Sequence, residues 1–416
     1  MNFFSYRGNE LYCESVPVER IAAEVGTPFY LYSASTITRH FKVFTEAFAG
    51  TDHVVCYSVK ACSNLAVLEL LAKEGAGADI VSGGELFRAL GAGIPADRIV
   101  FSGVGKRIDE IRYALDAGIL MFNVESAEEL HTLDMTARQM NRKAPLALRV
   151  NPDVDPKTHP YISTGMKKNK FGIPVTEALA IYREAAGMDG IEVVGVDCHI
   201  GSQLTTAEPF GEAVAKLMAL VDKLESEGIP VRYVDVGGGL GIVYDEESPP
   251  LPANYAETIV SALGRKDKIL ILEPGRVIVG NAGILVARIL YNKKGSTKNF
   301  VVVDAAMNDL IRPSLYDAYQ EVVPVIRTDR EEMVADVVGP ICESTDFLAR
   351  DHKLPIMSQG ELLAIKSAGA YGFSMSSQYN SRPRVAEVMV SEDRFQVVRD
   401  RETMDDLVRG ERIFKQ

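Results

Sequence analysis

Between residues 53 and 273, short apolar runs alternate with longer amphipathic stretches, and this alternation constrains the fold more than any other feature. The runs are rich in β-branched residues and apolar on both faces, which is typical of buried parallel strands. They are HVVCYSV (53–59), DIVS (79–82), RIVF (98–101), LMFNV (120–124), LALRV (146–150), VVGVDCHI (193–200), VRYVDV (231–236) and ILILE (269–273). Eight strand–helix units over roughly 220 residues predict a (β/α)8 barrel, TIM-like but shorter than the usual ~250 residues.

The helices between these runs have recognisable starts and faces. Ser82-Gly-Gly-Glu85 and Ser126-Ala-Glu-Glu129 both fit the S-x-x-E capping box, and each directly follows a predicted strand. One later helix is expected to have an apolar face made by Ala213, Leu217, Leu220 and Leu224.

After residue 280 the pattern changes. The runs GILVARILYNK, NFVVVDAAM, ELLAIKSAGAY and RVAEVMVS indicate strands separated by Gly, Asn, Asp or Pro. Few helical patterns remain, so we expect an antiparallel β domain, a sandwich or barrel, which the strand-like N-terminal segment joins. The predicted domains are therefore a barrel over 36–277 and a β domain built from 1–35 and 278–416.

Composition narrows the class of protein. The net charge is −12 and no basic tract is present, which argues against a nucleic-acid partner. No apolar run approaches the ~20 residues of a membrane span, and the N-terminus lacks the pattern of a secretory signal. The 5 cysteines are scattered, with neither Cys-x-x-Cys nor His-x-x-x-His, so we expect a reduced cytoplasmic protein without a metal site.

Active sites of such barrels lie at the C-terminal ends of the strands. The predicted strand ends carry an amine, an imidazole, a glycine-rich turn, a carboxylate and a guanidinium, which belong to Lys60, His199, Gly237–Gly239, Glu273 and Arg276.

Each of these groups has both a functional and a structural interpretation. Lys60 ends an apolar run, where desolvation favours the neutral amine that attacks an aldehyde, but a lysine can also extend to the barrel rim. The N–H groups of Gly237, Gly238 and Gly239 can bind a phosphate, with a hydroxyl from Ser202, or can simply form a tight turn. A dinucleotide fingerprint fails here, because Ile242 stands where Gly or Ala is required.

Glu273 and His199 are ambiguous in the same way. A carboxylate ending an apolar strand needs a cation, either a protonated pyridine nitrogen or Arg276 in a structural ion pair. His199 can lie flat against a ring or be a hydrogen-bonded barrel histidine. Pyridoxal phosphate requires a lysine, a phosphate cradle, a partner for its ring nitrogen and a flat group, and the combination of all four favours this cofactor.

These motifs resemble the barrel-type pyridoxal-phosphate decarboxylases, which include ornithine, arginine and diaminopimelate decarboxylases, over nearly the whole chain. The resemblance implies that Lys60 of YSVKA bonds the cofactor and that His199 of HIGS stacks on its ring. Glu273 of EPGR would pair with the pyridinium nitrogen. It further implies that the cofactor is held by Ser202, Gly237, Gly238, Gly239, Gly275, Arg276 and Tyr371.

Three segments, 149–173, 339–351 and 368–384, are similar to the diaminopimelate branch of this family. The similarity implies substrate contacts from Arg276, Arg312, Tyr316, Glu343 and Tyr371. It also implies that Cys342 is the proton donor and reaches the site from the partner subunit of a homodimer. The ornithine enzymes have Asp after that cysteine. Thr345 departs from the branch, which has Gly there.

The chemistry of the substrate agrees with this branch. The distal carboxylate of diaminopimelate needs a cationic fork, which Arg276 and Arg312 can form, and its ammonium needs an acceptor such as Glu343. Ornithine has no distal carboxylate and would leave these arginines unpaired.

The expected reaction is decarboxylation of meso-2,6-diaminopimelate to L-lysine and CO2, the last step of lysine biosynthesis. The alternatives are a decarboxylase of another basic amino acid or of a carboxylated polyamine, a racemase of the same fold, and a non-catalytic pyridoxal-phosphate-binding regulator. Arg312 and the sequence Cys342-Glu343-Ser344 argue against the first alternative. The carboxylate Glu273 argues against the second, because it favours a strong electron sink and a racemase benefits from a weaker one. Lys60, Cys342 and Glu273 together argue against the third.

Overall fold

The structure of the chain is a computed structural model that describes residues 2–155 and 170–415. The chain divides into two compact units. One comprises Met1–Ile37, Tyr244–Glu246 and Ile278–Gln416, and the other comprises Thr38–Val243 and Glu247–Val277.

The second unit is a closed barrel of eight parallel strands. These are β5 (His53–Ser58), β6 (Gly77–Ile80), β7 (Ile99–Phe101), β8 (Met121–Val124), β9 (Ala144–Asn151), β11 (Ile191–Asp197), β12 (Tyr233–Asp235) and β13 (Ile269–Leu272). Neighbours pair in chain order and β13 returns to β5, so the predicted barrel is confirmed. A short strand, β10 (Ile173–Pro174), extends the sheet beside β9.

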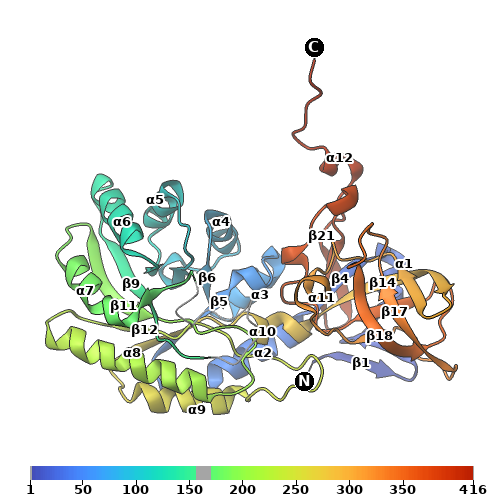
Figure 1. Cartoon of the computed structure of the whole chain (residues 1–416), viewed down its shortest axis with the longest axis horizontal. Helices are drawn as coiled ribbons and strands as arrows, with labels where there is room; N and C mark the ends of the chain where they lie inside the picture. The colour runs from blue at the N-terminus through green and yellow to red at the C-terminus, as the bar shows by residue number, and fades with distance from the viewer. Residues whose placement is uncertain (1, 156–169, 416) are drawn as a thin grey trace. The chain divides into compact units, whose positions relative to one another are not determined.

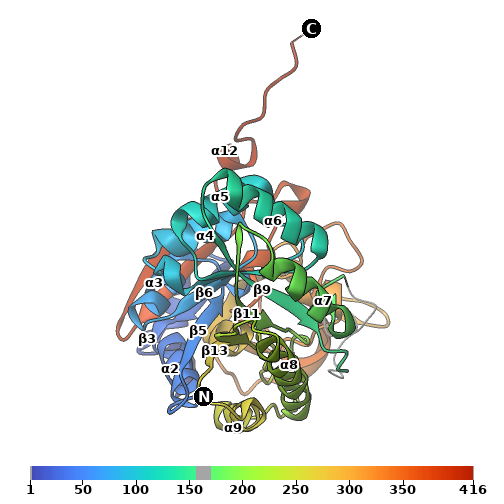
Figure 2. The same ribbon diagram turned by 90° about the vertical axis from the view of Figure 1, so that its left-hand side faces the viewer.

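Helices surround this ring of strands, as the view along the barrel shows (Figure 2). They are α2 (Ala34–Glu46), α3 (Leu65–Lys73), α4 (Gly83–Gly91), α5 (Ile108–Ala117), α6 (Ala127–Gln139), α7 (Val175–Ala186), α8 (Glu208–Ser226) and α9 (Pro252–Leu263). Figure 1 shows how they alternate with the strands along the chain. The predicted apolar face of α8 is confirmed, because its four residues are buried.

The predicted caps of α4 and α6 form, with one difference. Ser82 and Ser126 each accept the N–H of the third residue that follows. The reciprocal bonds of the capping box are replaced, because Glu85 and Glu129 accept the N–H of the residue before each serine. Both glutamates thereby tie a strand end to the next helix.

A layer of apolar side chains fills the barrel interior. It consists of Cys56, Val100, Met121, Ala147 and Ile271, all fully buried and contributed by five different strands. The barrel is therefore a packed core and not a pore, and a ligand can enter only beyond the strand ends.

The other unit is built on a large sheet with strand order β18 (Phe347–Pro355), β17 (Glu332–Val338), β15 (Asn299–Val303), β14 (Gly283–Lys294), β4 (Phe29–Ser33), β20 (Ala386–Ser391) and β21 (Arg394–Arg399). The strand β19 (Leu362–Ile365) pairs with β14 and with β16 (Val322–Pro324). The predicted β domain is confirmed and is mostly antiparallel, with two parallel pairs, β4–β20 and β15–β17.

The N-terminal segment joins this unit through β4, which lies between β14 and β20. Before it, β1 (Phe4–Arg7), β2 (Glu10–Cys13) and β3 (Val16–Pro17) form a small separate sheet, followed by α1 (Val18–Val25). The described chain also contains three short helices, which are α10 (Arg276–Val279), α11 (Arg312–Tyr316) and α12 (Met404–Leu407).

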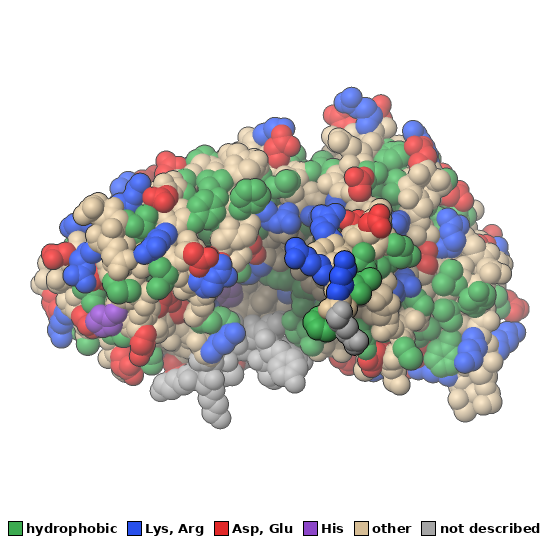
Figure 3. All heavy atoms as spheres, turned by 90° about the horizontal axis from the view of Figure 1, so that it is seen from above, with side chains coloured by type: hydrophobic (Ala, Val, Ile, Leu, Met, Phe, Trp, Pro, Cys, Tyr) green, Lys and Arg blue, Asp and Glu red, His purple; other side chains and the backbone are tan. Residues whose placement is uncertain are grey.

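Acidic and basic side chains are interspersed over the face of the molecule that Figure 3 shows. In the part of the chain that the structure describes, no helix is both long and apolar enough to cross a bilayer.

Candidate active site

A cavity of about 400 Å³ lies at the C-terminal ends of the barrel strands. Three of the predicted residues, Lys60, His199 and Glu273, line it together. They come from the ends of β5, β11 and β13, which are far apart in the sequence. The remaining lining residues are Val81, Ser102, Gly103, Val104, Gly105, Arg149, Phe171 and Asp197. A cavity of this size with a few convergent polar groups is typical of a cofactor site.

Lys60 is paired with a carboxylate that the sequence analysis did not identify. Its Nζ lies 2.5 Å from Oδ2 of Asp79, a fully buried residue of β6. The hydroxyl of Ser58 donates to the same oxygen over 2.7 Å. The expectation of a poorly solvated ammonium is wrong, because the Lys60 side chain is 32% exposed and its charge is compensated by Asp79.

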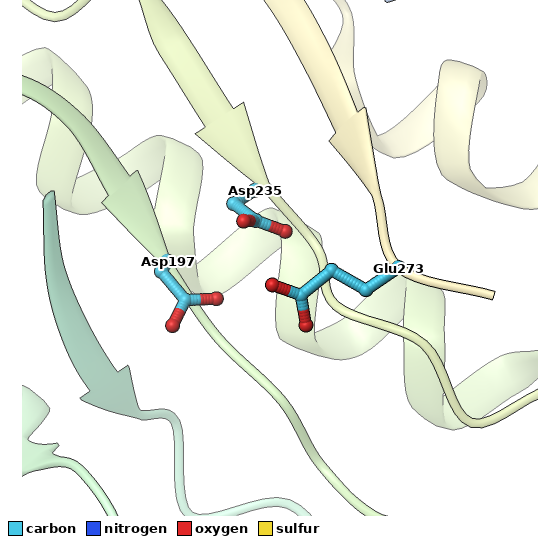
Figure 4. Close-up of side chains that lie close together, drawn as sticks. All are labelled: Asp197, Asp235 and Glu273. Atoms are coloured by element: carbon cyan, nitrogen blue, oxygen red, sulfur yellow. The ribbon is translucent and has the colours of Figure 1, made fainter. Parts of the chain in front are cut away.

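Three buried carboxyl groups meet beside the cavity. Asp197 ends β11, Asp235 ends β12 and Glu273 follows β13, and their nearest oxygens all lie within 4.8 Å of one another (Figure 4). Burial first, and then repulsion between them, raises the pKa of each carboxyl well above its usual value. The cluster is therefore stabilised either by retaining protons or by a cation placed beside it.

The hydrogen bonds that reach Glu273 come from neutral donors. Asn123 donates to Glu273 over 3.4 Å and to Asp235 over 3.1 Å, and Ser102 donates to Glu273 over 3.3 Å. Oδ1 of Asp197 is buried and has no hydrogen-bond partner among the described residues. A protonated pyridine nitrogen fits such a group of acids, because it brings both a donor and a positive charge.

The glycine-rich turn fits a close-packed phosphate cradle. A Cβ on Gly238 would lie 2.1 Å from the carbonyl oxygen of Glu273, and one on Gly239, where φ is +116°, would lie 2.3 Å from that of Gly201. Gly237 donates its N–H to Asp235 over 2.9 Å. Within the described chain, no residue accepts a hydrogen bond from the N–H of Gly238 or Gly239. These two donors suit an anion.

The remaining residues of the EPGR motif lie beside this turn. Gly275 packs closely, since an added Cβ would lie 3.0 Å from Cβ of Ser58. Arg276 donates to the hydroxyl of Ser202 over 3.2 Å. The structure thus brings together Arg276 and Ser202, two residues predicted from separate motifs.

His199 presents a neutral ring to the cavity. Burial, together with the positive charges of Arg149 and Lys60, lowers the pKa of His199 well below its usual value. Its Nδ1 accepts the N–H of Gly201 over 3.1 Å, which fixes the ring orientation. A flat, uncharged imidazole can stack on an aromatic cofactor.

The other predicted residues lie in the β-sheet unit. Arg312 begins α11 and is buried, with its guanidinium 4.4 Å from the centre of the Tyr244 ring. Tyr316 ends the same helix and is half-buried. Tyr371 is half-buried and has a left-handed backbone with φ of +55°.

Cys342 and Glu343 lie on an exposed but well-anchored loop. The N–H of Cys342 donates to Asn380 over 3.0 Å, and Glu343 accepts the hydroxyl hydrogen of Tyr379. Thr345 is not among the residues with positive φ, so threonine replaces the family's glycine without backbone strain. Residues 156–169 of the segment similar to the diaminopimelate branch lie outside the described residues.

Sequence reasoning missed five polar residues of the site: Asp79, Ser102, Asn123, Arg149 and Asp197. Ser102, Asn123 and Arg149 stand near the C-terminal end of a predicted apolar strand or directly after it, and Asp197 lies within one. Asp79 instead opens the predicted run 79–82 and lies near a strand end only because the observed β6 begins at Gly77. The argument that drew attention to Glu273, a polar group with no obvious partner at a strand end, also draws attention to Asn123 and Arg149, but it does not reach Asp79.

Comparison with known proteins shows the family to which the chain belongs. The family described as pyridoxal-dependent decarboxylase, pyridoxal binding domain, matches residues 34–280. The diaminopimelate decarboxylase of Pseudomonas aeruginosa is 53% identical over 416 residues and is covered over 100% of both chains. That of Haemophilus influenzae is 50% identical over 409 residues, covering 98% of each chain.

Solved structures give the same result. The diaminopimelate decarboxylase of Helicobacter pylori complexed with L-lysine matches with a TM-score of 0.91 and 46% identity, covering 94% of this chain and 98% of that one. The enzyme of M. jannaschii in complex with L-lysine matches with a TM-score of 0.94 and 39% identity, covering 99% and 98%.

The barrel, its strand-end cavity and these matches define a pyridoxal-dependent decarboxylase, and the chain belongs to that family. Its cofactor is pyridoxal phosphate. Within the family it falls among the diaminopimelate decarboxylases, which it matches over its whole length.

Proposed function

We propose that this chain removes CO2 from the D-configured centre of meso-2,6-diaminopimelate and releases L-lysine, as the last step of lysine biosynthesis. The observation that carries the proposal is the cavity at the barrel strand ends, where Lys60, His199 and Glu273 face the same space. The substrate follows from the relatives that match the full chain, which are diaminopimelate decarboxylases.

The residues at the strand ends would hold the cofactor. Lys60 would bond its aldehyde carbon, and Glu273 would keep its ring nitrogen protonated. His199 would lie against the ring. When bound, pyridoxal phosphate supplies an electron-poor ring that accepts the electron pair of the broken carbon–carbon bond. Its phosphate would be held by Ser202, Gly237, Gly238, Gly239, Gly275 and Arg276, with Tyr371 also near the cofactor.

The residues of the β-sheet unit would recognise the substrate. Arg312 would bind the distal carboxylate with its guanidinium fork, and Arg276, which already donates to Ser202, would complete the cationic end of the site. Glu343 would accept from the distal ammonium, and Tyr316 and Tyr371 would border the substrate. Cys342 would give a proton to the carbon that has lost CO2.

We further propose a homodimer in which Cys342 and Glu343 complete the site of the partner subunit. Their exposure on an anchored loop supports this arrangement. A cytoplasmic location is consistent with the five cysteines, all of which are free.

The test is CO2 release from diaminopimelate, ornithine, arginine and lysine at equal concentrations. We expect turnover of diaminopimelate to exceed that of the others by orders of magnitude, since only it carries a distal carboxylate for Arg312. Preference for ornithine or arginine would favour the other basic amino-acid decarboxylases. No release from any substrate by cofactor-loaded protein would favour a non-catalytic regulator.

A further inference from the structure

Glu125 joins three separate segments of the barrel through one buried carboxylate. It directly follows β8, and its side chain is only 2% exposed. Its Oε1 accepts the N–H of Gly103 over 3.1 Å and a guanidinium N–H of Arg149 over 2.9 Å. Its Oε2 accepts the N–H of Gly172 over 2.9 Å. These three hydrogen bonds bring the ends of β7 and β9 and the start of β10 to one point.

All three segments border the cofactor cavity. Gly103 and Arg149 line it, and so does Phe171, the neighbour of Gly172. The Arg149 guanidinium lies 4.8 Å from the centre of the Phe171 ring. Gly172 has a φ of +73°, and an added Cβ would lie 3.1 Å from the carbonyl oxygen of Arg149. The chain can therefore approach Arg149 this closely only with glycine at 172.

A second buried ion pair supports Glu125 from behind. Glu129 accepts the N–H of Glu125 over 3.1 Å and pairs with Nζ of Lys106 over 2.7 Å. Lys106, with a side chain only 1% exposed, donates to the carbonyl oxygen of Gly103 over 2.8 Å. Gly103 is thus held at both its N–H and its C=O, and the two acids are balanced by Lys106 and Arg149.

We propose that Glu125 is a positioning residue that sets this wall of the cavity before the cofactor binds. A preformed wall lowers the ordering cost of binding, so loss of the Glu125 carboxylate should weaken cofactor affinity. Removal of one member of a buried ion pair also leaves the charge of Arg149 uncompensated beside the cavity. The proposal rests on this cavity being the cofactor site, but not on the identity of the substrate.

The two available substitutions should act differently. Glu125→Ala removes the acceptors of all three donors. Glu125→Gln keeps one oxygen, which should face Gly103 and Arg149 because that side presents two donors, one of them charged. The amide nitrogen of the glutamine would then face the N–H of Gly172, which loses its acceptor.

The first measurement is hydrogen exchange of the apoprotein, read by mass spectrometry over 102–106 and 170–174. In Glu125→Gln we expect exchange at Gly172 to accelerate at least about tenfold while Gly103 stays protected, and in Glu125→Ala we expect both to accelerate. The second measurement is titration of the apoprotein with pyridoxal phosphate alone. We expect the Kd to rise at least about tenfold in Glu125→Ala and by a smaller factor in Glu125→Gln.

Asp134→Asn is the matched control. Asp134 is also a buried carboxylate of the barrel unit, pairs with Arg138 over 2.9 Å and accepts the N–H of Gly190 over 2.9 Å. Gly190 directly precedes β11, at the end of the barrel away from the cavity. The control should lower the melting temperature and leave the cofactor Kd unchanged.

Two results would overturn the proposal. One is a cofactor Kd within twofold of wild type in Glu125→Gln despite accelerated exchange at Gly172. The other is an equal loss of affinity in Asp134→Asn, which would make the effect one of barrel stability. If Glu125→Ala fails to fold, the nearly isosteric Glu125→Gln still tests the proposal. Its exchange at Gly172 and its cofactor Kd are measured separately.

Discussion

Lys60, two residues beyond the end of β5, forms a 2.5 Å ion pair with Asp79 of the neighbouring strand β6. Asp79 is fully buried, whereas Lys60 lines the cavity and about a third of its side chain is exposed, 32%. The lysine is therefore held by a fixed carboxylate while its amine stays within reach of a ligand, as a residue that bonds a cofactor requires.

We expect Lys60→Ala to abolish the visible absorbance of the bound cofactor and nearly all turnover, because the covalent attachment orients the reactive group. Absorbance spectra and CO2 release measure both effects. Lys73→Ala, a change of an exposed lysine on α3, should leave both unchanged. A Lys60→Ala protein that keeps the absorbance band and wild-type turnover would show that another residue bonds the cofactor.

We expect Glu273→Gln to lower kcat by about 10²-fold or more, on the scale of electrostatic transition-state effects. The amide cannot hold the ring nitrogen protonated as a carboxylate does, so the charge that develops during the reaction is less stabilised. Cofactor affinity, measured separately by titration, should change much less. Wild-type turnover with saturating cofactor would make Glu273 a structural residue only.

The same residue gives a prediction about pH and stability of the apoprotein. Burial and the neighbouring Asp235 raise the pKa of Glu273 well above the usual 4.5. The folded state then holds a proton that the unfolded chain releases, so this group destabilises the fold increasingly as pH rises above the usual value toward the raised one.

Glu273→Gln cannot ionise and should escape this loss. The melting temperature of the mutant apoprotein, relative to wild type, should therefore increase from about pH 5 to about pH 8. Thermal melts of both proteins across this range measure it. Parallel curves would mean that Glu273 titrates normally in the folded apoprotein.

The barrel was predictable because each strand is an apolar run with its own start and end, and Lys60, His199 and Glu273 were found because each ends such a run. The partners of these residues were harder to predict. Asp79 and Asn123 are single polar residues in apolar runs. Only the closed barrel shows that Asp79 faces Lys60 and that Asn123 faces Glu273. Asn123 and Glu273 come from non-consecutive strands, β8 and β13, and sequence spacing alone does not show which side chains of such strands meet inside the ring.

Arg312 gives a prediction about specificity. Loss of a charge-assisted hydrogen bond removes about 1.5–3 kcal/mol, so Arg312→Ala should raise the KM for diaminopimelate at least about tenfold. L-Lysine keeps the distal carboxylate and should lose inhibitory potency by a similar factor. Cadaverine lacks this carboxylate and should inhibit both proteins equally. Arg350→Ala, on an exposed arginine of the same unit, serves as the control.

The exposed loop that carries Cys342 leads to the prediction of a shared site. In a two-fold dimer with shared sites, each site combines Lys60 of one subunit with Cys342 of the other. Lys60→Ala and Cys342→Ala should each be inactive as homodimers. Mixed dimers should recover activity, because one of their two sites carries both substitutions and the other carries neither.

The expected amount of recovery follows from the symmetry. When the two inactive proteins are mixed in equal amounts under conditions of subunit exchange, about half of the dimers are mixed, and each has one intact site. Activity should therefore reach roughly a quarter of the wild-type value. Exchange is verified independently with two affinity tags, one on each mutant. If tagged mixed dimers form and no activity returns, each chain builds its own site, and the role of Cys342 and Glu343 in the partner's site must be withdrawn.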